Sequence, residues 1–268
     1  MYERQAPNTS VATLLFLCLV LTGMGSRLAL ADSLESKEIP PSPQEAPLRG
    51  LLVDEVFHSL LIDQLEYRVD DGDRFARWDI EGWVGRERDR IWIRTEGNQP
   101  TRSRDRGELE AQLLYTHLVS AFWEVQVGLR HQRLYGNGPN RSRTFLSLGF
   151  EGSAPYRIDV EPFLFLSNEG RLSARLAATT DWFLTQRLIV QPRFEVQAAA
   201  REDRDIEVGS GLNDIELGLR LRYELERELA PYIGISWIRK VGTTADLARR
   251  EGDRVRSIDF VLGVRFWF

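Results

Sequence analysis

The sequence of 268 residues predicts an all-β fold, an antiparallel transmembrane β-barrel of about twelve strands. Polar and apolar residues alternate with a period of two along most of the chain after residue 53. Charged residues recur on one face of nearly every alternating segment, and the chain ends on Phe268 within such a segment. After residue 31, no run approaches the roughly eighteen apolar residues that a membrane-spanning helix needs. Alternating strands are therefore the predicted means of crossing a membrane.

Residues 1–31 are predicted to be a signal peptide rather than part of the fold. A short polar start with Arg4 precedes an apolar stretch from Val11 to Met24, and Ala29-Leu30-Ala31 has the small residues that signal peptidase recognises. Cleavage there would remove every Cys and Met of the sequence. The mature chain would then offer no thiol or thioether ligand to a metal.

Residues 32–52 are predicted to form a flexible periplasmic lead, and residues 53–268 the barrel. The lead is rich in Ser, Glu and Pro, which bury too little apolar surface to offset chain entropy. In the barrel region, the clearest alternation places Ile258, Phe260 and Leu262 on one face and Asp259 on the other. The twelve predicted strands cover residues 59–69, 75–84, 90–97, 108–117, 121–131, 143–152, 158–167, 171–183, 188–199, 214–225, 230–241 and 256–268.

The connections between these strands predict how the barrel is oriented. The second, fourth, sixth and eighth connections are brief, whereas the third (98–107), fifth (132–142), ninth (200–213) and eleventh (242–255) are longer. Outer-membrane barrels have short periplasmic turns and longer outer loops. We therefore expect the N-terminus in the periplasm and the long loops outside.

The polarity of the strands favours a membrane barrel over a soluble sandwich, which would bury its apolar faces. In a barrel the charged faces point into the lumen, so we expect a narrow lumen laced with ion pairs. Aromatic residues near predicted strand ends would form an interfacial girdle. These are Trp78, Trp83, Trp92, Phe122, Trp123, Tyr156, Trp182, Tyr223, Tyr232 and Trp267.

Several ordered stretches go beyond a generic barrel. They include Leu61-Ile-Asp-Gln-Leu-Glu-Tyr-Arg68, Trp78-Asp-Ile-Glu-Gly-Trp-Val-Gly85, Gly218-Leu-Arg-Leu-Arg-Tyr-Glu224 and Ala230-Pro-Tyr-Ile-Gly234. From about residue 51 to residue 268 the chain resembles the copper resistance protein B family of Gram-negative outer membranes. The resemblance implies an outer-membrane location, a role in copper handling and a periplasmic multicopper oxidase as a partner.

One departure from that family concerns the copper ligands. Family members commonly carry a segment rich in Met and His between signal peptide and barrel, whereas this chain has Pro, Glu and Ser there. Copper would have to bind through imidazole and carboxylate groups, which suit Cu(II) better than Cu(I). The candidate metal ligands are His58, Asp63, Glu66, Glu108, Glu110 and His131. For the carboxylates, ion pairing with lumen arginines is the alternative, since a buried charge needs a partner.

Arginines of the last long connection are candidate contacts to lipopolysaccharide. Arg249, Arg250 and Arg254 lie there, and guanidinium groups bind phosphate in a bidentate manner. Pairing with acidic residues of the same loops is an equally open alternative. A general nucleic-acid partner is not expected, because 35 Lys and Arg face 40 Asp and Glu, a net charge of -5.

The sequence thus predicts an outer-membrane barrel of a copper resistance system that binds copper ions or passes them through its lumen. A metal-independent small-solute channel or structural barrel is the alternative. An outer-membrane lipid hydrolase comes third. It would need a serine activated by a histidine, for which His117 with Ser120 and His131 with Ser142 or Ser147 are the candidates. No residue is assigned a catalytic role.

Overall fold

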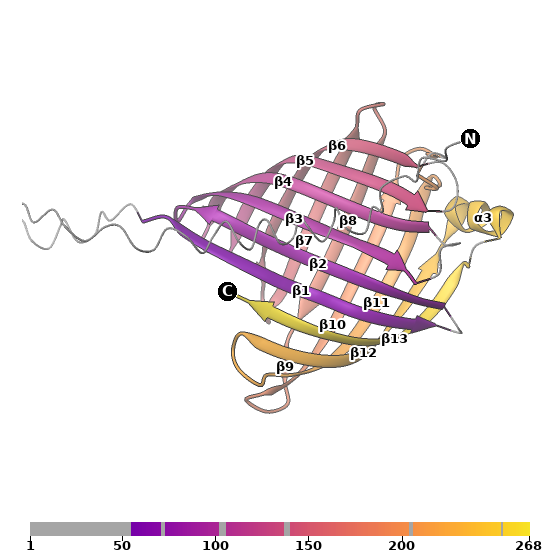
Figure 1. Cartoon of the computed structure of the whole chain (residues 1–268). Helices are drawn as coiled ribbons and strands as arrows, with labels where there is room; N and C mark the ends of the chain where they lie inside the picture. Colours follow the sequence, from indigo (N-terminus) through magenta and orange to yellow (C-terminus); the bar gives the residue numbers. More distant parts are fainter. Residues whose placement is uncertain (1–54, 71–72, 102–105, 137–139, 204–205, 253) are drawn as a thin grey trace, which may run out of the picture. The chain divides into compact units, whose positions relative to one another are not determined.

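The computed structural model describes residues 55–70, 73–101, 106–136, 140–203, 206–252 and 254–268. The predicted signal peptide and lead, residues 1–52, lie outside this range. The described residues form one antiparallel sheet that closes on itself (Figure 1). Its strands are β1 (Phe57–Asp70), β2 (Asp73–Gly85), β3 (Asp89–Pro100), β4 (Arg106–Ser120), β5 (Trp123–Gly136), β6 (Arg141–Ala154), β7 (Ile158–Ser167), β8 (Leu172–Thr180), β9 (Trp182–Phe183), β10 (Leu188–Ala199), β11 (Gly211–Tyr223), β12 (Leu229–Lys240) and β13 (Arg256–Trp267).

Twelve of these strands make the barrel, as predicted. Each of β1 to β8 pairs with the next, β8 pairs with β10, and β10 to β13 continue to the closing pair of β13 with β1. The two-residue strand β9 also pairs with β10 and continues the line of β8 beyond a break at Asp181. The predicted strand 171–183 is therefore one interrupted strand, and the fold prediction is confirmed.

The connections gather at two ends of the barrel. The turn end carries residues 86–88, 121–122, 155–157, 184–187 and 224–228, together with the C-terminus, and the loop end carries the others. At the loop end only residues 200–210 and 241–255 are long. The expected length of the third and fifth connections was wrong, because β3 to β6 extend further than their alternation indicated and take up most of those residues.

A helix, α3 (Gly242–Glu251), occupies the last connection, where the sequence analysis expected a loop. It ends at Gly252, whose positive φ of 82° suits glycine and whose N–H donates to the carbonyl of Ala248. Ala245 and Ala248 of α3 are buried, and the N–H of Gly209 donates to the hydroxyl of Thr244 at 2.9 Å, which joins the helix to the residues just before β11. Within the described residues, no helix has the length and apolar character needed to cross a membrane.

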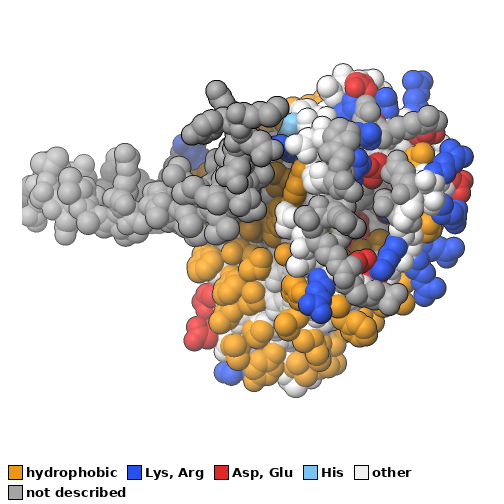
Figure 2. Space-filling model, turned by 45° about the vertical axis from the view of Figure 1, so that its right-hand side comes forward, with side chains coloured by type: hydrophobic (Ala, Val, Ile, Leu, Met, Phe, Trp, Pro, Cys, Tyr) orange, Lys and Arg blue, Asp and Glu red, His pale blue; other side chains and the backbone are white. Residues whose placement is uncertain are grey.

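The barrel is apolar outside and polar inside. Leu65, Leu129, Phe260 and Leu262 are among the large hydrophobic side chains that remain exposed on the outer wall, which Figure 2 shows covered by hydrophobic groups. Charged side chains such as Arg68, 0% exposed, are buried instead. This polarity suits a wall in contact with lipid around a polar interior.

The lumen also holds an aromatic cluster that the sequence analysis did not foresee. Trp92, Leu114, Phe145, Phe163 and Phe165 are buried together. The rings of Phe163 and Phe165 stack with centroids 5.6 Å apart. Trp92 and Tyr232 were expected in an interfacial girdle, but both are buried in the lumen, since their strand positions fall on the inward face.

Candidate functional site in the charged lumen

Opposite charges fill the lumen at several levels, and the first network lies near the barrel's closing seam. Glu66 of β1 is 2% exposed and accepts hydrogen bonds from Nε of Arg68 at 2.7 Å and Nε of Arg220 at 2.7 Å. Arg68 also contacts Glu216 of β11 at 3.1 Å, and Nη1 of Arg77 of β2 reaches the same carboxylate at 3.4 Å. The network therefore connects β1 and β2 with β11 across the lumen.

A second network centres on Arg94 of β3. Its guanidinium contacts the carboxylates of Glu81 at 3.2 Å and Glu161 at 3.1 Å, and also that of Glu151. It lies 4.8 Å from the ring centroid of Trp92, so its apolar face is covered as well. Three carboxylates from β2, β6 and β7 thus share one cation.

The third network joins β8 to β3, β4 and β5. Arg175 of β8 pairs with Glu96 and lies 3.7 Å from Glu110, which itself pairs with Arg130 at 2.5 Å. Arg130 stands 4.3 Å over the ring of Phe165, whose aromatic cluster forms one side of the network. These contacts confirm the prediction of a lumen laced with ion pairs.

The four predicted carboxylate ligands all face this interior, but they have different partners. Asp63 accepts from Nε of Arg265 at 2.9 Å, and Glu66 and Glu110 pair with arginines as described above. Glu108 accepts from the neutral amide of Gln132 at 2.5 Å. Within the described part of the chain, Glu108 makes no ion pair with an arginine.

The three histidines lie on the outer face of the wall, away from those carboxylates. His58 pairs in register with the exposed Val84, His117 shares the outer face of β4 with the exposed Tyr115, and His131 stands opposite Thr144. Nδ1 of His117 contacts Asp89 at 2.8 Å, and Nδ1 of His131 contacts the Thr144 hydroxyl at 2.9 Å. Neither contact is a serine–histidine pair. The structure therefore brings no histidine to the lumen.

The described residues contain no group of three or more His, Cys, Asp or Glu arranged to hold a metal ion. The predicted ligands are spread instead over the length and both faces of the wall. The two-residue alternation in the sequence was enough to predict that His131 faces outward, because it lies two residues from the apolar Leu129 on the same strand. The same alternation predicts that Phe163 and Phe165 face inward, since they are on the same face of their strand as Asp159 and Glu161.

The predicted lipopolysaccharide contacts differ in their surroundings. Arg249 on α3 pairs with Asp246 at 2.6 Å, with both side chains exposed. Arg250 is exposed and makes no ion pair within the described residues. Arg254 contacts Asp70 at 2.6 Å and Asp73 at 3.0 Å, and so ties the last connection to the first one.

Comparison with known proteins identifies the family. A family model described as copper resistance protein B precursor (CopB) matches residues 56–268, essentially all of the described barrel. The chain belongs to the copper resistance protein B family. Copper resistance protein B of Escherichia coli is 42% identical over 212 residues, which cover 78% of this chain and 69% of that protein. The copper resistance protein B homolog of Pseudomonas syringae pv. tomato is 39% identical over 207 residues, covering 77% and 68%.

Among solved structures, the NanC porin shares the fold of this family member. It has a TM-score of 0.51 and 13% sequence identity, over 78% of this chain and 99% of the porin. The fold and the family together show that this chain is an outer-membrane β-barrel, as the sequence predicted.

Proposed function

We propose that this copper resistance protein B barrel serves copper resistance by taking up Cu(II) weakly on carboxylates of its lumen, either to hold the ion or to pass it across the outer membrane. Membership of the family carries the assignment to copper. The proposed oxidation state follows from the ligands, because carboxylate and amide oxygens suit Cu(II) and the predicted mature chain has no sulfur ligand.

Glu108 is the proposed contact for the ion. It lies inside the barrel towards the loop end of β4, and its partner Gln132 leaves the negative charge uncompensated within the described residues. Asp63, Glu66 and Glu110 are each compensated by at least one arginine, so a cation would have to displace that arginine first. Binding of a cation at Glu108 should therefore cost less free energy than binding at the other three carboxylates.

Weak binding supports passage more than storage. A single carboxylate with a nearby amide would leave water in most of the coordination sphere of Cu(II), and a conducted ion must bind loosely enough to leave again. The cross-lumen ion pairs of Arg94 and Arg175 would then have to shift as the ion passes.

Calorimetric titration of the purified chain in detergent with Cu(II), and separately with Cu(I), tests this proposal. In Glu108→Gln the Cu(II) affinity should fall by about tenfold, equivalent to roughly 1.4 kcal/mol. Glu87→Gln, on an exposed turn at the other end, is the matched control and should bind normally. If Cu(II) binding were lost only in a double variant, His58→Asn with His131→Asn, the binding site would be on the outer wall and not in the lumen. If the chain bound neither ion, the proposal that this barrel takes up copper would be wrong.

The filled lumen favours one alternative, a structural barrel or small-solute channel without metal function. The arginines of the three networks already have carboxylate partners, so they need no ion to remain stable. Liposome swelling that is the same with and without Cu(II), together with unchanged copper tolerance of cells carrying Glu108→Gln, would support this alternative.

We also propose that α3 contacts the phosphate groups of lipopolysaccharide through Arg249 and Arg250. Both are in the last turn of an exposed helix at the loop end, and phosphate binds guanidinium through paired N–H groups. Arg254 is assigned a different role, the tie to Asp70 and Asp73, because its guanidinium is already held by two carboxylates.

A further inference from the structure

A cavity of about 50 Å³ lies inside the loop end of the barrel, next to Asp203, Ile206 and Val208 of the connection that precedes β11. Among the described residues it is lined by four arginines, Arg130, Arg171, Arg175 and Arg201, and by one carboxylate, Asp203. A water molecule needs about 10–15 Å³ of such space, so the cavity has room for a few waters or for one small polyatomic ion.

The carboxylates that neutralise Arg130 and Arg175 do not line the cavity. Arg175 pairs with Glu96 and Arg130 with Glu110, and neither glutamate is among the lining residues. Each guanidinium has five N–H donors, of which these pairs use only some. Nε of Arg130 is buried without a hydrogen-bond partner in the described structure. At Arg130 and Arg175 the cavity wall therefore presents N–H donors, while their carboxylate partners lie outside the cavity.

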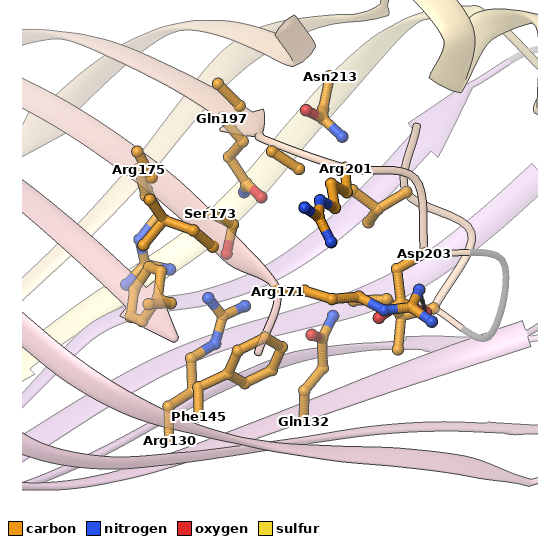
Figure 3. Close-up of a pocket in the computed structure, with 17 residues that line it drawn as sticks. Arg130, Gln132, Phe145, Arg171, Ser173, Arg175, Gln197, Arg201, Asp203 and Asn213 are labelled. Atoms are coloured by element: carbon orange, nitrogen blue, oxygen red, sulfur yellow. Dashed lines mark ion pairs between the residues drawn. The ribbon is translucent and has the colours of Figure 1, made fainter. Parts of the chain in front are cut away.

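Arg201 gives the cavity a positive charge that no carboxylate of the described residues neutralises. It follows β10, is exposed to solvent and makes no ion pair within the described part of the chain. Figure 3 shows the guanidinium groups of Arg201 and Arg130 entering the same space from different sides, with Ser173 and Gln132 nearby. Arg171 is held differently, by Asp203 at 2.8 Å and the carbonyl of Glu202 at 3.0 Å.

The backbone fixes this arrangement. Asp203 and Val208 exchange two backbone hydrogen bonds, of 2.7 and 2.9 Å, which hold these two lining residues together beside the cavity. The amide of Asn213 donates to the carbonyl of Gly209 at 2.9 Å and anchors Gly209 to β11. The backbone at Asp203, Val208 and Gly209 is thus fixed before any ligand arrives, which lowers the entropic cost of binding.

We propose that this cavity is a binding site for a small free oxyanion of the phosphate or sulfate type. Arginine donors on several sides match the oxygens of a tetrahedral anion, and the excess positive charge on the wall selects against cations. The site lies at the loop end of the lumen and is independent of copper binding at Glu108. An anion and a cation would then be handled by separate groups of the same interior.

Calorimetric titration of the full chain in detergent with inorganic phosphate, and with sulfate, tests the proposal. Saturable binding is expected, with an affinity about tenfold lower in Arg201→Gln and largely restored in Arg201→Lys. Arg187→Gln removes the same charge from an exposed turn at the other end of the barrel and is expected to bind like the unaltered chain. Arg201 has no ion pair to lose, so the barrel should fold, which the heat-dependent gel mobility of the variant checks.

Three results would overturn the proposal. The first is the absence of saturable binding to the unaltered chain. The second is an equal loss of affinity in Arg201→Gln and Arg187→Gln, which would indicate a general effect of net charge. The third is displacement of phosphate by lipid A in mixed micelles, which would assign the cavity to a membrane-borne phosphate instead of a free ion.

Discussion

Nε of Arg220 on β11 donates to Oε1 of Glu66 on β1 across 2.7 Å, joining two strands that β12 and β13 separate in the sheet. The same carboxylate accepts from Arg68 at 2.7 Å and from the hydroxyl of Tyr232 at 3.0 Å. A buried carboxylate with three donors is a fixed part of the wall, and its removal leaves charges that no water can reach.

Replacing Glu66 should therefore destabilise the barrel. In Glu66→Gln the guanidinium groups of Arg68 and Arg220 lose their shared negative partner, at a cost of about 3–5 kcal/mol. Urea unfolding of the chain refolded in lipid vesicles, followed by tryptophan fluorescence, measures the change in the free energy of unfolding. Glu87→Gln on the exposed turn should change it by less than about 0.5 kcal/mol, and similar losses in both variants would contradict the role of Glu66.

Arg175 is expected to keep the lumen closed. Its guanidinium crosses from β8 to Glu96 on β3 and lies 5.6 Å from the ring of Phe165. Arg175→Ala removes this crossing and leaves the carboxylates of Glu96 and Glu110 without that cation, so cation conductance in planar bilayers should rise severalfold. Arg187→Ala, in an exposed turn, is the control. An unchanged conductance in Arg175→Ala would show that other side chains close the lumen.

Gly263 makes room for the ring of Tyr232, its partner in register on β12. A Cβ at Gly263 would lie 2.5 Å from that ring, so Gly263→Ala must push Tyr232 away from Glu66. We expect a loss of about 1–3 kcal/mol in the unfolding assay, as for overpacking in a core. At Gly82 the nearest atom would be 3.3 Å away, so Gly82→Ala should cost less. Tyr232→Phe separates the lost hydrogen bond from the steric effect.

Lipopolysaccharide retention should depend on α3. An Arg249→Gln, Arg250→Gln variant is expected to co-purify with severalfold less lipopolysaccharide at low salt, because two phosphate-binding groups are removed. Arg254→Gln should affect retention less and instead speed proteolysis of the last connection, since it breaks the contacts to Asp70 and Asp73. Equal retention in all three proteins would defeat the proposed role of the helix.

The sequence predicted the architecture because a strand in a membrane barrel repeats its environment every two residues. Asp259 between Ile258 and Phe260 is enough to assign both faces of β13, and in the structure Asp259 is 1% exposed while Phe260 is 68% exposed. The same rule fails where side chains have a mixed character. Trp92 and Tyr232 suit an interface as well as a polar interior, and only their register assigns them to the lumen.

The site could be predicted only as a set of inward carboxylates. Which arginine each carboxylate meets depends on the stagger of strands across the lumen, as in the pair of Arg94 on β3 with Glu161 on β7. The sequence pattern within a single strand does not determine how close two side chains from different strands lie across the lumen. The helix α3 was missed for a related reason, because the burial of its two alanines and its contact with Gly209 depend on residues distant in sequence.

The pairing of the last residue with the first strand has a consequence for assembly. Leu60 and Phe268 exchange two backbone hydrogen bonds, of 3.0 and 2.8 Å, at the seam between β1 and β13. These partners are about as far apart in sequence as the barrel allows, so forming the contact has a large entropic cost of loop closure. We therefore expect it to form late in folding. Until it forms, β1 and β13 are open edges that can add foreign strands. The seam is thus both the final step of folding and the point where an unfinished barrel is most prone to aggregate.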